Sequence, residues 1–381
     1  MNEFSLPADG VYLGRIWLPE AQGPSVVSIR GEEVVDITSR SAPTVRDICE
    51  MDSPADFVRS AAGTVVGSLS EIACNKPGDM DRMHFLAPCD LQAVKACGVT
   101  FASSMVERVI EEKAAGDPAK AQDIRARVGE AIGGSLRDIK AGSDAAAAVK
   151  ATLMAEGLWS QYLEVGIGPD AEVFSKAQVL SSVGPGADVG LHPISRWNNP
   201  EPEIVLAVSS TGAIVGASLG NDVNLRDVEG RSALLLGKAK DNNASCAIGP
   251  VIRLFDESFS LDDIRGAELD LKVTGPDGFV LDGHSSMKEI SRDPADLVSQ
   301  TLGRHHQYPD GLMLFLGTLF APTQDRDVPG EGFTHKIGDV VTISMDQLGR
   351  LSNTVRLSTE CSEWTFGLSA FMRNLAARKL I

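Results

Sequence analysis

Two apolar segments joined by a short polar turn lie in the middle of the chain. Residues 204–208 are entirely apolar, residues 209–212 are typical of a turn, and residues 213–219 form the returning segment. Apolar runs of this length between turn residues are typical of buried β-strands. The sequence therefore predicts a β-hairpin. The 37 glycines and 19 prolines among 381 residues favour many further turns, so we expect an α+β, β-rich fold.

The rest of the chain predicts two parts of unequal size. Short strands precede a turn-rich break, and we place a boundary near residue 88. This gives a smaller, β-rich N-terminal domain over residues 1–88 and a larger domain over residues 89–381. Helical periodicity predicts a helical insert at about 103–156. Further strands are expected at residues 269–274, 311–316 and 339–344.

Charge and composition exclude several partner classes. The formal net charge is -17, and no basic stripe is present, so we expect neither nucleic acid nor an anionic membrane surface as a partner. No apolar run approaches the roughly 20 residues that span a bilayer. The six cysteines lack Cys-x-x-Cys spacing, and the N-terminus lacks the pattern of a secretory signal. We therefore expect reduced thiols and a cytoplasmic location.

Three acidic residues are predicted to meet at one end of the hairpin. Glu201 and Glu203 are two positions apart, so on a strand they face the same side. Folding the hairpin about its turn sets Glu201 opposite roughly Gly220, and Asp222 lies at the same end. Carboxylates this close repel one another unless a cation intervenes, and Mg2+ prefers such oxygen ligands. Spacing alone also fits solvated glutamates at a strand edge.

The motifs around these residues resemble the fumarylacetoacetate-hydrolase-like family. Glu201-Pro202-Glu203 is followed by residues 221–227, with Asp222 and an Arg-Asp pair, and then by Lys240. The resemblance implies that Glu201, Glu203 and Asp222 hold a metal, Mg2+ with Mn2+ as an alternative, and that Lys240 contacts the substrate. It also implies a mixed β-sandwich or β-roll catalytic domain, and a homodimer or homotetramer.

Smaller matches extend the resemblance along the chain. Gly317 and Thr318 resemble a Gly-Thr pair that binds a substrate carboxylate in that family. Phe174-Ser175-Lys176 resembles a Phe-Leu-Lys segment. Two interpretations of Lys176 remain open: it either reaches the site or is a cation at a strand end.

One departure from the family pattern bears on the reaction. Hydrolases of the family carry Asn-Tyr-x-x-His-x-x-Glu, whereas here Ser104 stands in place of the histidine and Glu107 is retained. Serine has no group that titrates near neutral pH, so it is a poor substitute for a water-activating imidazole. We take Glu107 as the candidate proton-transfer residue, with Ser104 beside it in the catalytic region. Both residues also fit a helix capping box.

The whole-chain pattern resembles a bacterial subgroup of the family that dehydrates 2-keto-3-deoxypentonates. The matching segments are residues 221–227, 240–246 and 306–311. The resemblance implies a lyase that forms 2,5-dioxopentanoate from a 2-oxo sugar acid, with the D or L configuration left open. The alternatives are a hydrolase that releases pyruvate from a 2,4-dioxo acid, and a non-catalytic, metal-stabilised binding protein. Three carboxylates, Mg2+ and an anionic substrate leave a negative excess, which Lys240 reduces.

Overall fold

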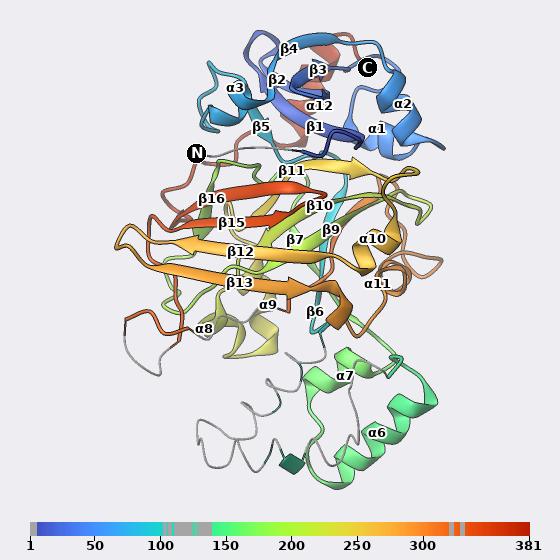
Figure 1. The fold of residues 1–381 in the computed structure, drawn as a ribbon, viewed down its shortest axis with the longest axis vertical. Helices are drawn as coiled ribbons and strands as arrows, with labels where there is room; N and C mark the ends of the chain where they lie inside the picture. Colours follow the sequence, from blue (N-terminus) through green and yellow to red (C-terminus); the bar gives the residue numbers. More distant parts are fainter. Residues whose placement is uncertain are drawn as a thin grey trace.

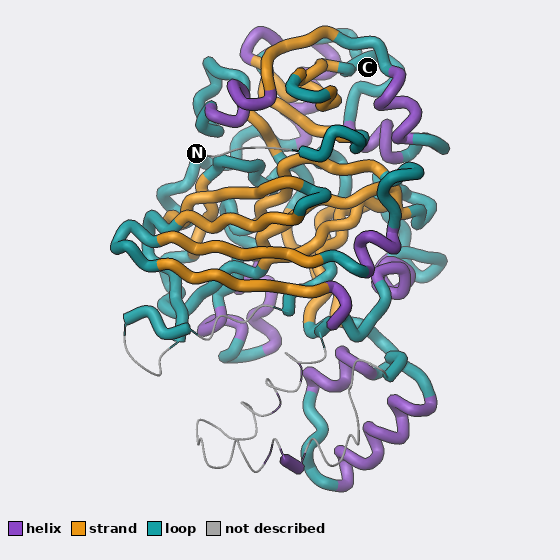
Figure 2. Tube along the Cα trace, viewed as in Figure 1, coloured by secondary structure: helices purple, strands orange, loops and turns teal. Residues whose placement is uncertain are grey.

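The computed structural model shows two β-sheets packed between an N-terminal lobe and a helical region (Figure 1). It describes residues 6–101, 105, 109, 124, 126–127, 139–319, 324–327 and 332–381. Figure 2 shows that strands make up most of the middle of the molecule. This arrangement confirms the predicted β-rich α+β class.

The larger sheet has eleven strands and contains the predicted hairpin. Its order is β4-β3-β2-β1-β11-β10-β9-β14-β6-β7, with β5 pairing β1. The strands are β1 (Tyr12–Leu18), β2 (Gly23–Arg30), β3 (Glu33–Asp36), β4 (Thr64–Ser68), β5 (His84–Leu86), β6 (Ala93–Gly98), β7 (Glu172–Ala177), β9 (Pro202–Val208), β10 (Ile214–Asp222), β11 (Cys246–Leu254) and β14 (Leu312–Phe315). Strands β14 and β6 are parallel, whereas β9 and β10 form the antiparallel hairpin.

The smaller sheet has five strands in the order β13-β12-β15-β16-β8. Its strands are β8 (Asp188–Leu191), β12 (Glu268–Thr274), β13 (Val280–Ser286), β15 (Val340–Met345) and β16 (Gly349–Leu357). The predicted strands near residues 269, 311 and 339 are thereby confirmed as β12, β14 and β15. In β12, exposed and buried residues alternate, which is typical of a strand with one face on a core.

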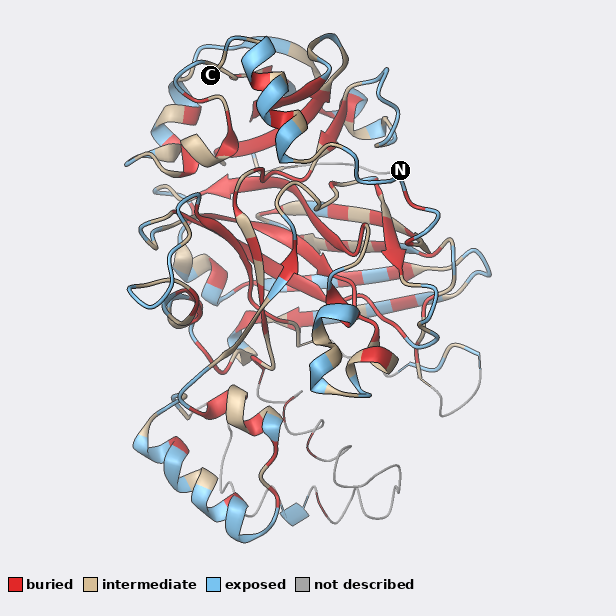
Figure 3. Cartoon of the chain, turned by 180° about the vertical axis from the view of Figure 1, so that it is seen from behind, coloured by how far each residue is buried: buried red, intermediate tan, exposed pale blue. Residues whose placement is uncertain are grey.

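The two sheets enclose one apolar core. Side chains from β9 such as Ile204 and Leu206 belong to the same buried cluster as Leu271 of β12 and Ile343 of β15. Every residue of β9 is buried, because this strand lies in the interior of the larger sheet. Figure 3 shows the buried strands at the centre of the molecule. The hairpin that carries the acidic residues is therefore held by packing on all sides.

The N-terminal strands continue the larger sheet instead of forming a separate one. Tyr12 of β1 pairs with Arg253 of β11, and the C-terminal helix α12 (Leu368–Ala377) lies beside β2 in the same lobe (Figure 1). The expected boundary near residue 88 falls between β5 and β6. Independent folding of residues 1–88 and 89–381 stays a prediction.

The described helices are short. None of them is long and apolar enough to cross a membrane. They are α1 (Val45–Cys49), α2 (Pro54–Ser60), α3 (Leu69–Cys74), α6 (Asp144–Ala155), α7 (Gln161–Ile167), α8 (Arg226–Glu229), α9 (Leu236–Lys240), α10 (Leu261–Arg265) and α11 (Pro294–Thr301), with 3-10 turns η1 (Pro19–Ala21), η3 (Ala233–Leu235) and η4 (Met287–Glu289). Helix α6 falls within the predicted insert at about 103–156, whereas α7 follows it outside those bounds.

Candidate metal centre

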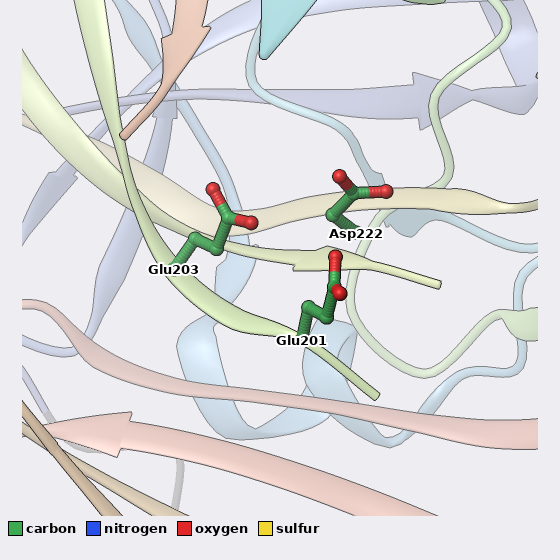
Figure 4. A group of neighbouring side chains, drawn as sticks. All are labelled: Glu201, Glu203 and Asp222. Atoms are coloured by element: carbon green, nitrogen blue, oxygen red, sulfur yellow. The ribbon is translucent and has the colours of Figure 1, made fainter. Parts of the chain in front are cut away.

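The three predicted carboxylates meet at the end of the central hairpin (Figure 4). Glu201 directly precedes β9, Glu203 is its second residue, and Asp222 is the last residue of β10. One oxygen atom from each carboxylate lies within 4.8 Å of the others. Their side chains are buried, with residue exposures of 7%, 2% and 1%. The expectation that these residues form one cluster is confirmed.

The strand register differs from the prediction by two residues. Glu203, and not Glu201, lies opposite Gly220. The turn accounts for one residue of this difference, and the irregularity between Ile214 and Gly216 shifts the pairing by one more. The cluster survives because Asp222 still donates its backbone N–H to the carbonyl oxygen of Glu201 at 3.1 Å.

Lys240 reaches the carboxylates from the end of α9. Its Nζ lies 2.5 Å from Glu201 Oε2 and 3.1 Å from Asp222 Oδ2. The side chain is buried, and its ammonium lies 5.7 Å from the centre of the Phe174 ring. The structure therefore brings the predicted substrate lysine to the predicted metal ligands.

Lys176 lies in the same cluster, so the structure supports the interpretation in which its side chain reaches the site. It belongs to β7, is fully buried, and its Nζ lies 2.8 Å from Asp222 Oδ1. The sequence offered only the Phe-Ser-Lys match as a signal for it. Its long-range contact could not be read from spacing, because β7 and β10 are not neighbours in the sheet.

Two neutral groups complete the contacts of the glutamates. Asn224 Nδ2 donates to Glu201 Oε1 at 3.0 Å, and the backbone N–H of Gly317 donates to Glu203 Oε2 at 2.7 Å. Gly317 has a φ of 90°, and a Cβ there would lie 2.1 Å from Thr100 Oγ1. Only glycine fits this corner. Asn224 lies in the matched segment 221–227, but its contact with Glu201 was not predicted from the sequence.

The electrostatics of the cluster favour a bound cation. Burial raises the pKa of Glu201 to about 7, although Lys240 opposes the shift. Burial, together with the charges of Asp222 and Glu201, raises the pKa of Glu203 well above its usual range. Burial also opposes ionisation of Asp222, but Lys176 and Lys240 outweigh it and hold the pKa of Asp222 below its usual value.

These residues fit a hard divalent cation. Three buried carboxylates with converging oxygens match the ligands of Mg2+. The two ammonium groups neutralise only part of their charge, and burial is the main reason that the pKa values of the glutamates are raised. The pKa of Lys240, which burial alone would lower, is raised well above its usual value by Asp222 and Glu201.

The remaining predicted site residues are placed only in part. Gly317 is buried at the cluster and Thr318 follows it, half-buried; their roles in binding the substrate carboxylate stay predictions. Ser104 and Glu107 lie outside the described residues. Their proposed catalytic roles stay predictions.

The comparisons with known proteins agree with the site. Residues 168–356 match the model of the fumarylacetoacetate (FAA) hydrolase C-terminal family. A probable 2-keto-3-deoxyxylonate dehydratase of Haloferax volcanii is 28% identical over 326 residues, covering 86% of this chain and 93% of that protein. The 2-dehydro-3-deoxy-D-arabinonate dehydratase of Saccharolobus solfataricus is 31% identical over 188 residues, covering 49% of this chain and 58% of that protein.

Solved structures show the same fold. A 2-keto-3-deoxy-D-arabinonate dehydratase complexed with magnesium and 2,5-dioxopentanoate superposes with a TM-score of 0.63 at 19% identity, covering 91% of this chain and 99% of that one. A fumarylacetoacetate hydrolase from Exiguobacterium antarcticum gives 0.56 at 16% identity, with the same coverage of both chains. The family model places residues 168–356 of this chain in the fumarylacetoacetate (FAA) hydrolase C-terminal family, and the solved structures agree in fold.

Proposed function

We propose that this protein is a Mg2+-dependent dehydratase that converts a 2-keto-3-deoxypentonate into 2,5-dioxopentanoate, a step of non-phosphorylating pentose degradation. The observation that carries the proposal is the buried cluster of Glu201, Glu203 and Asp222 beside Lys240. The names of the two curated relatives, both dehydratases of such acids, support the same reaction class.

The three carboxylates would hold the ion, and Lys240 would bind the acid. When bound there, Mg2+ supplies Lewis acidity beside the oxygen atoms of a 2-oxo acid. The ammonium of Lys240 lies between Glu201 and Asp222, so a small shift of its side chain lets it pair with an anionic substrate oxygen. Burial of these groups keeps bulk water away and strengthens their electrostatic interactions.

The reaction needs one proton acceptor and one proton donor. A proton leaves C3 and the hydroxyl leaves C4 as water, which forms a C3–C4 double bond. A proton then leaves C5 and a proton is added at C3, which moves the double bond to C4–C5, and the resulting enol tautomerises to the C5 aldehyde. We assign proton transfer to Glu107, with Ser104 beside it, and binding of the substrate carboxylate to Thr318 and Gly317. A Schiff base is not required in this scheme.

The direct test is product analysis with purified protein and Mg2+. Each 2-keto-3-deoxypentonate epimer is supplied separately, and the expected product is a five-carbon aldehyde acid. Glu201→Gln should abolish both turnover and Mg2+ binding, while the exposed Glu257→Gln should change neither. A Glu201→Gln variant with full activity would contradict the metal assignment.

The other two hypotheses are distinguished by the same assay. Release of pyruvate from a 2,4-dioxo acid, with no aldehyde from either pentonate, would instead support the hydrolase. Mg2+ binding with no conversion of either substrate class would support a non-catalytic protein. Replacing Mg2+ with Mn2+ tests the second metal.

Location and assembly remain parts of the proposal. All six cysteines are free in the structure, which agrees with the cytoplasmic location that the sequence predicts. The homodimer or homotetramer implied by the family resemblance is tested by light scattering on the purified protein.

A further inference from the structure

Lys176 is a buried cation whose ammonium is surrounded by oxygen atoms. It lies 2.8 Å from Asp222 Oδ1, and it donates to the main-chain carbonyl oxygens of Lys240 at 2.5 Å and Val223 at 3.4 Å. An ammonium has three N–H donors, and a buried charge is stable only when it is paired and hydrogen-bonded. Three oxygen neighbours match three donors, so the side chain has one favoured position.

The first consequence concerns Asp222. Lys176 approaches Oδ1 of this carboxylate, whereas the other oxygen, Oδ2, faces Lys240 at 3.1 Å. Lys240 also contacts Glu201. The two lysines thereby approach different oxygens of Asp222, which together fix the orientation of this carboxylate.

The second consequence concerns the main chain of Lys240. Its carbonyl oxygen, at the end of α9, accepts hydrogen bonds from Lys176 Nζ and from Ser245 Oγ at 2.8 Å. Two donors on one carbonyl fix the end of this five-residue helix. The position of the Lys240 side chain therefore depends on the same ammonium that orients Asp222.

We infer that Lys176 is a positioning residue that sets both the orientation of the Asp222 carboxylate and the place of Lys240. Its exposure of 0% keeps it from touching substrate, so its action passes through these two neighbours. The inference rests on the proposed metal-dependent function. Groups that orient metal ligands typically change metal affinity by 10-fold to 100-fold when they are replaced.

The test is Lys176→Met, which keeps an unbranched side chain but removes the ammonium group and its charge. Mg2+ is titrated into metal-free protein by calorimetry, well below the melting temperature. The dissociation constant for Mg2+ should rise by about 10-fold to 100-fold. Binding of pyruvate, a non-reacting 2-oxo acid, should stay weakened at saturating Mg2+ because Lys240 is no longer anchored.

Lys95→Met is the matched control. Lys95 lies on the neighbouring strand β6 and donates to Ser175 Oγ at 3.0 Å, away from the cluster, so its replacement should leave Mg2+ affinity unchanged. A role for Lys176 in fold stability alone would lower the melting temperature and leave the Mg2+ dissociation constant at its wild-type value. That result would overturn the inference.

Two further observations keep the inference testable if Lys176→Met does not fold. Lys176→Gln retains a neutral donor and should give a smaller loss of Mg2+ affinity. A crystal structure of the Mg2+-loaded wild type should show Lys176 still paired with Asp222 Oδ1; an Asp222 carboxylate turned away from Lys176 would refute the inference. If the wild type itself binds no Mg2+, the proposed function fails first.

Discussion

Removal of the divalent ion should change the stability of the protein in a pH-dependent way. Burial raises the pKa of Glu201 from 4.5 to about 7. Burial also raises the pKa of Glu203 well above its usual range. A carboxyl group with a raised folded-state pKa contributes stability that is complete below its unfolded value. That stability is lost as the pH rises through the folded value. The metal-free protein should therefore weaken between about pH 4.5 and pH 7, and further as Glu203 ionises.

The expected magnitude follows from the shift of Glu201 alone. From 4.5 to about 7, the shift corresponds to a loss of about 3 kcal/mol of unfolding free energy. Mg2+ needs ionised carboxylates, so it offsets this loss only where they are ionised. At 100 times its dissociation constant, a ligand adds about 2.7 kcal/mol.

Urea unfolding with EDTA or with Mg2+, at about pH 5.5 and about pH 8, measures the effect. We expect a gain of about 2 to 3 kcal/mol from Mg2+ at the higher pH and much less at the lower pH. Glu201→Gln should show little gain at either pH. An equal Mg2+ gain at both pH values would refute the reasoning, because it would mean that proton binding and metal binding do not compete.

Three further changes test other parts of the site and fold. Gly317→Ala forces a Cβ against Thr100 at a positive φ and should cost about 1 to 3 kcal/mol of unfolding free energy, with weaker Mg2+ binding by calorimetry. Arg326→Met leaves the fully buried Asp339 without its paired guanidinium and should cost about 3 to 5 kcal/mol in urea unfolding; a loss below about 1 kcal/mol would contradict it. Glu107→Gln should lower kcat and leave the Mg2+ dissociation constant unchanged. A loss of Mg2+ affinity in parallel with the loss of kcat would contradict the assignment of proton transfer to Glu107.

The carboxylate cluster could be predicted because its geometry is local. Glu201 and Glu203 share a strand face, and a short turn returns the chain to Asp222, so two rules of strand geometry are enough. The register differs from the rough expectation by two residues, which is within the slip that an unknown turn centre allows. The irregularity near Gly216 accounts for one of them and leaves no mark in the hydrophobic pattern. A cluster of three side chains tolerates that error, whereas an assignment of individual strand pairs does not.

The position of Lys176 could not be predicted, because it depends on contacts between distant segments. β7 joins the sheet through β6, β14 and β9 before the order reaches β10. Each of these pairings has its own register, and β6 with β7 contains a further irregularity. The N-terminal strands show the same limit: their joining to β11 through Tyr12 and Arg253 depends on packing between residues far apart in sequence.

The charge of the complete cluster explains why a second lysine belongs there. With its three carboxylates ionised, as metal binding requires, the site has one net negative charge once Lys176 and Lys240 are both counted. A divalent ion changes this to one positive charge, and a monoanionic 2-oxo acid then neutralises it. With Lys240 alone, the loaded site would be neutral and the bound acid would leave a buried negative charge. Burying an unpaired charge is costly, so Lys176 makes a metal-loaded site suited to an acid, although it never touches the substrate.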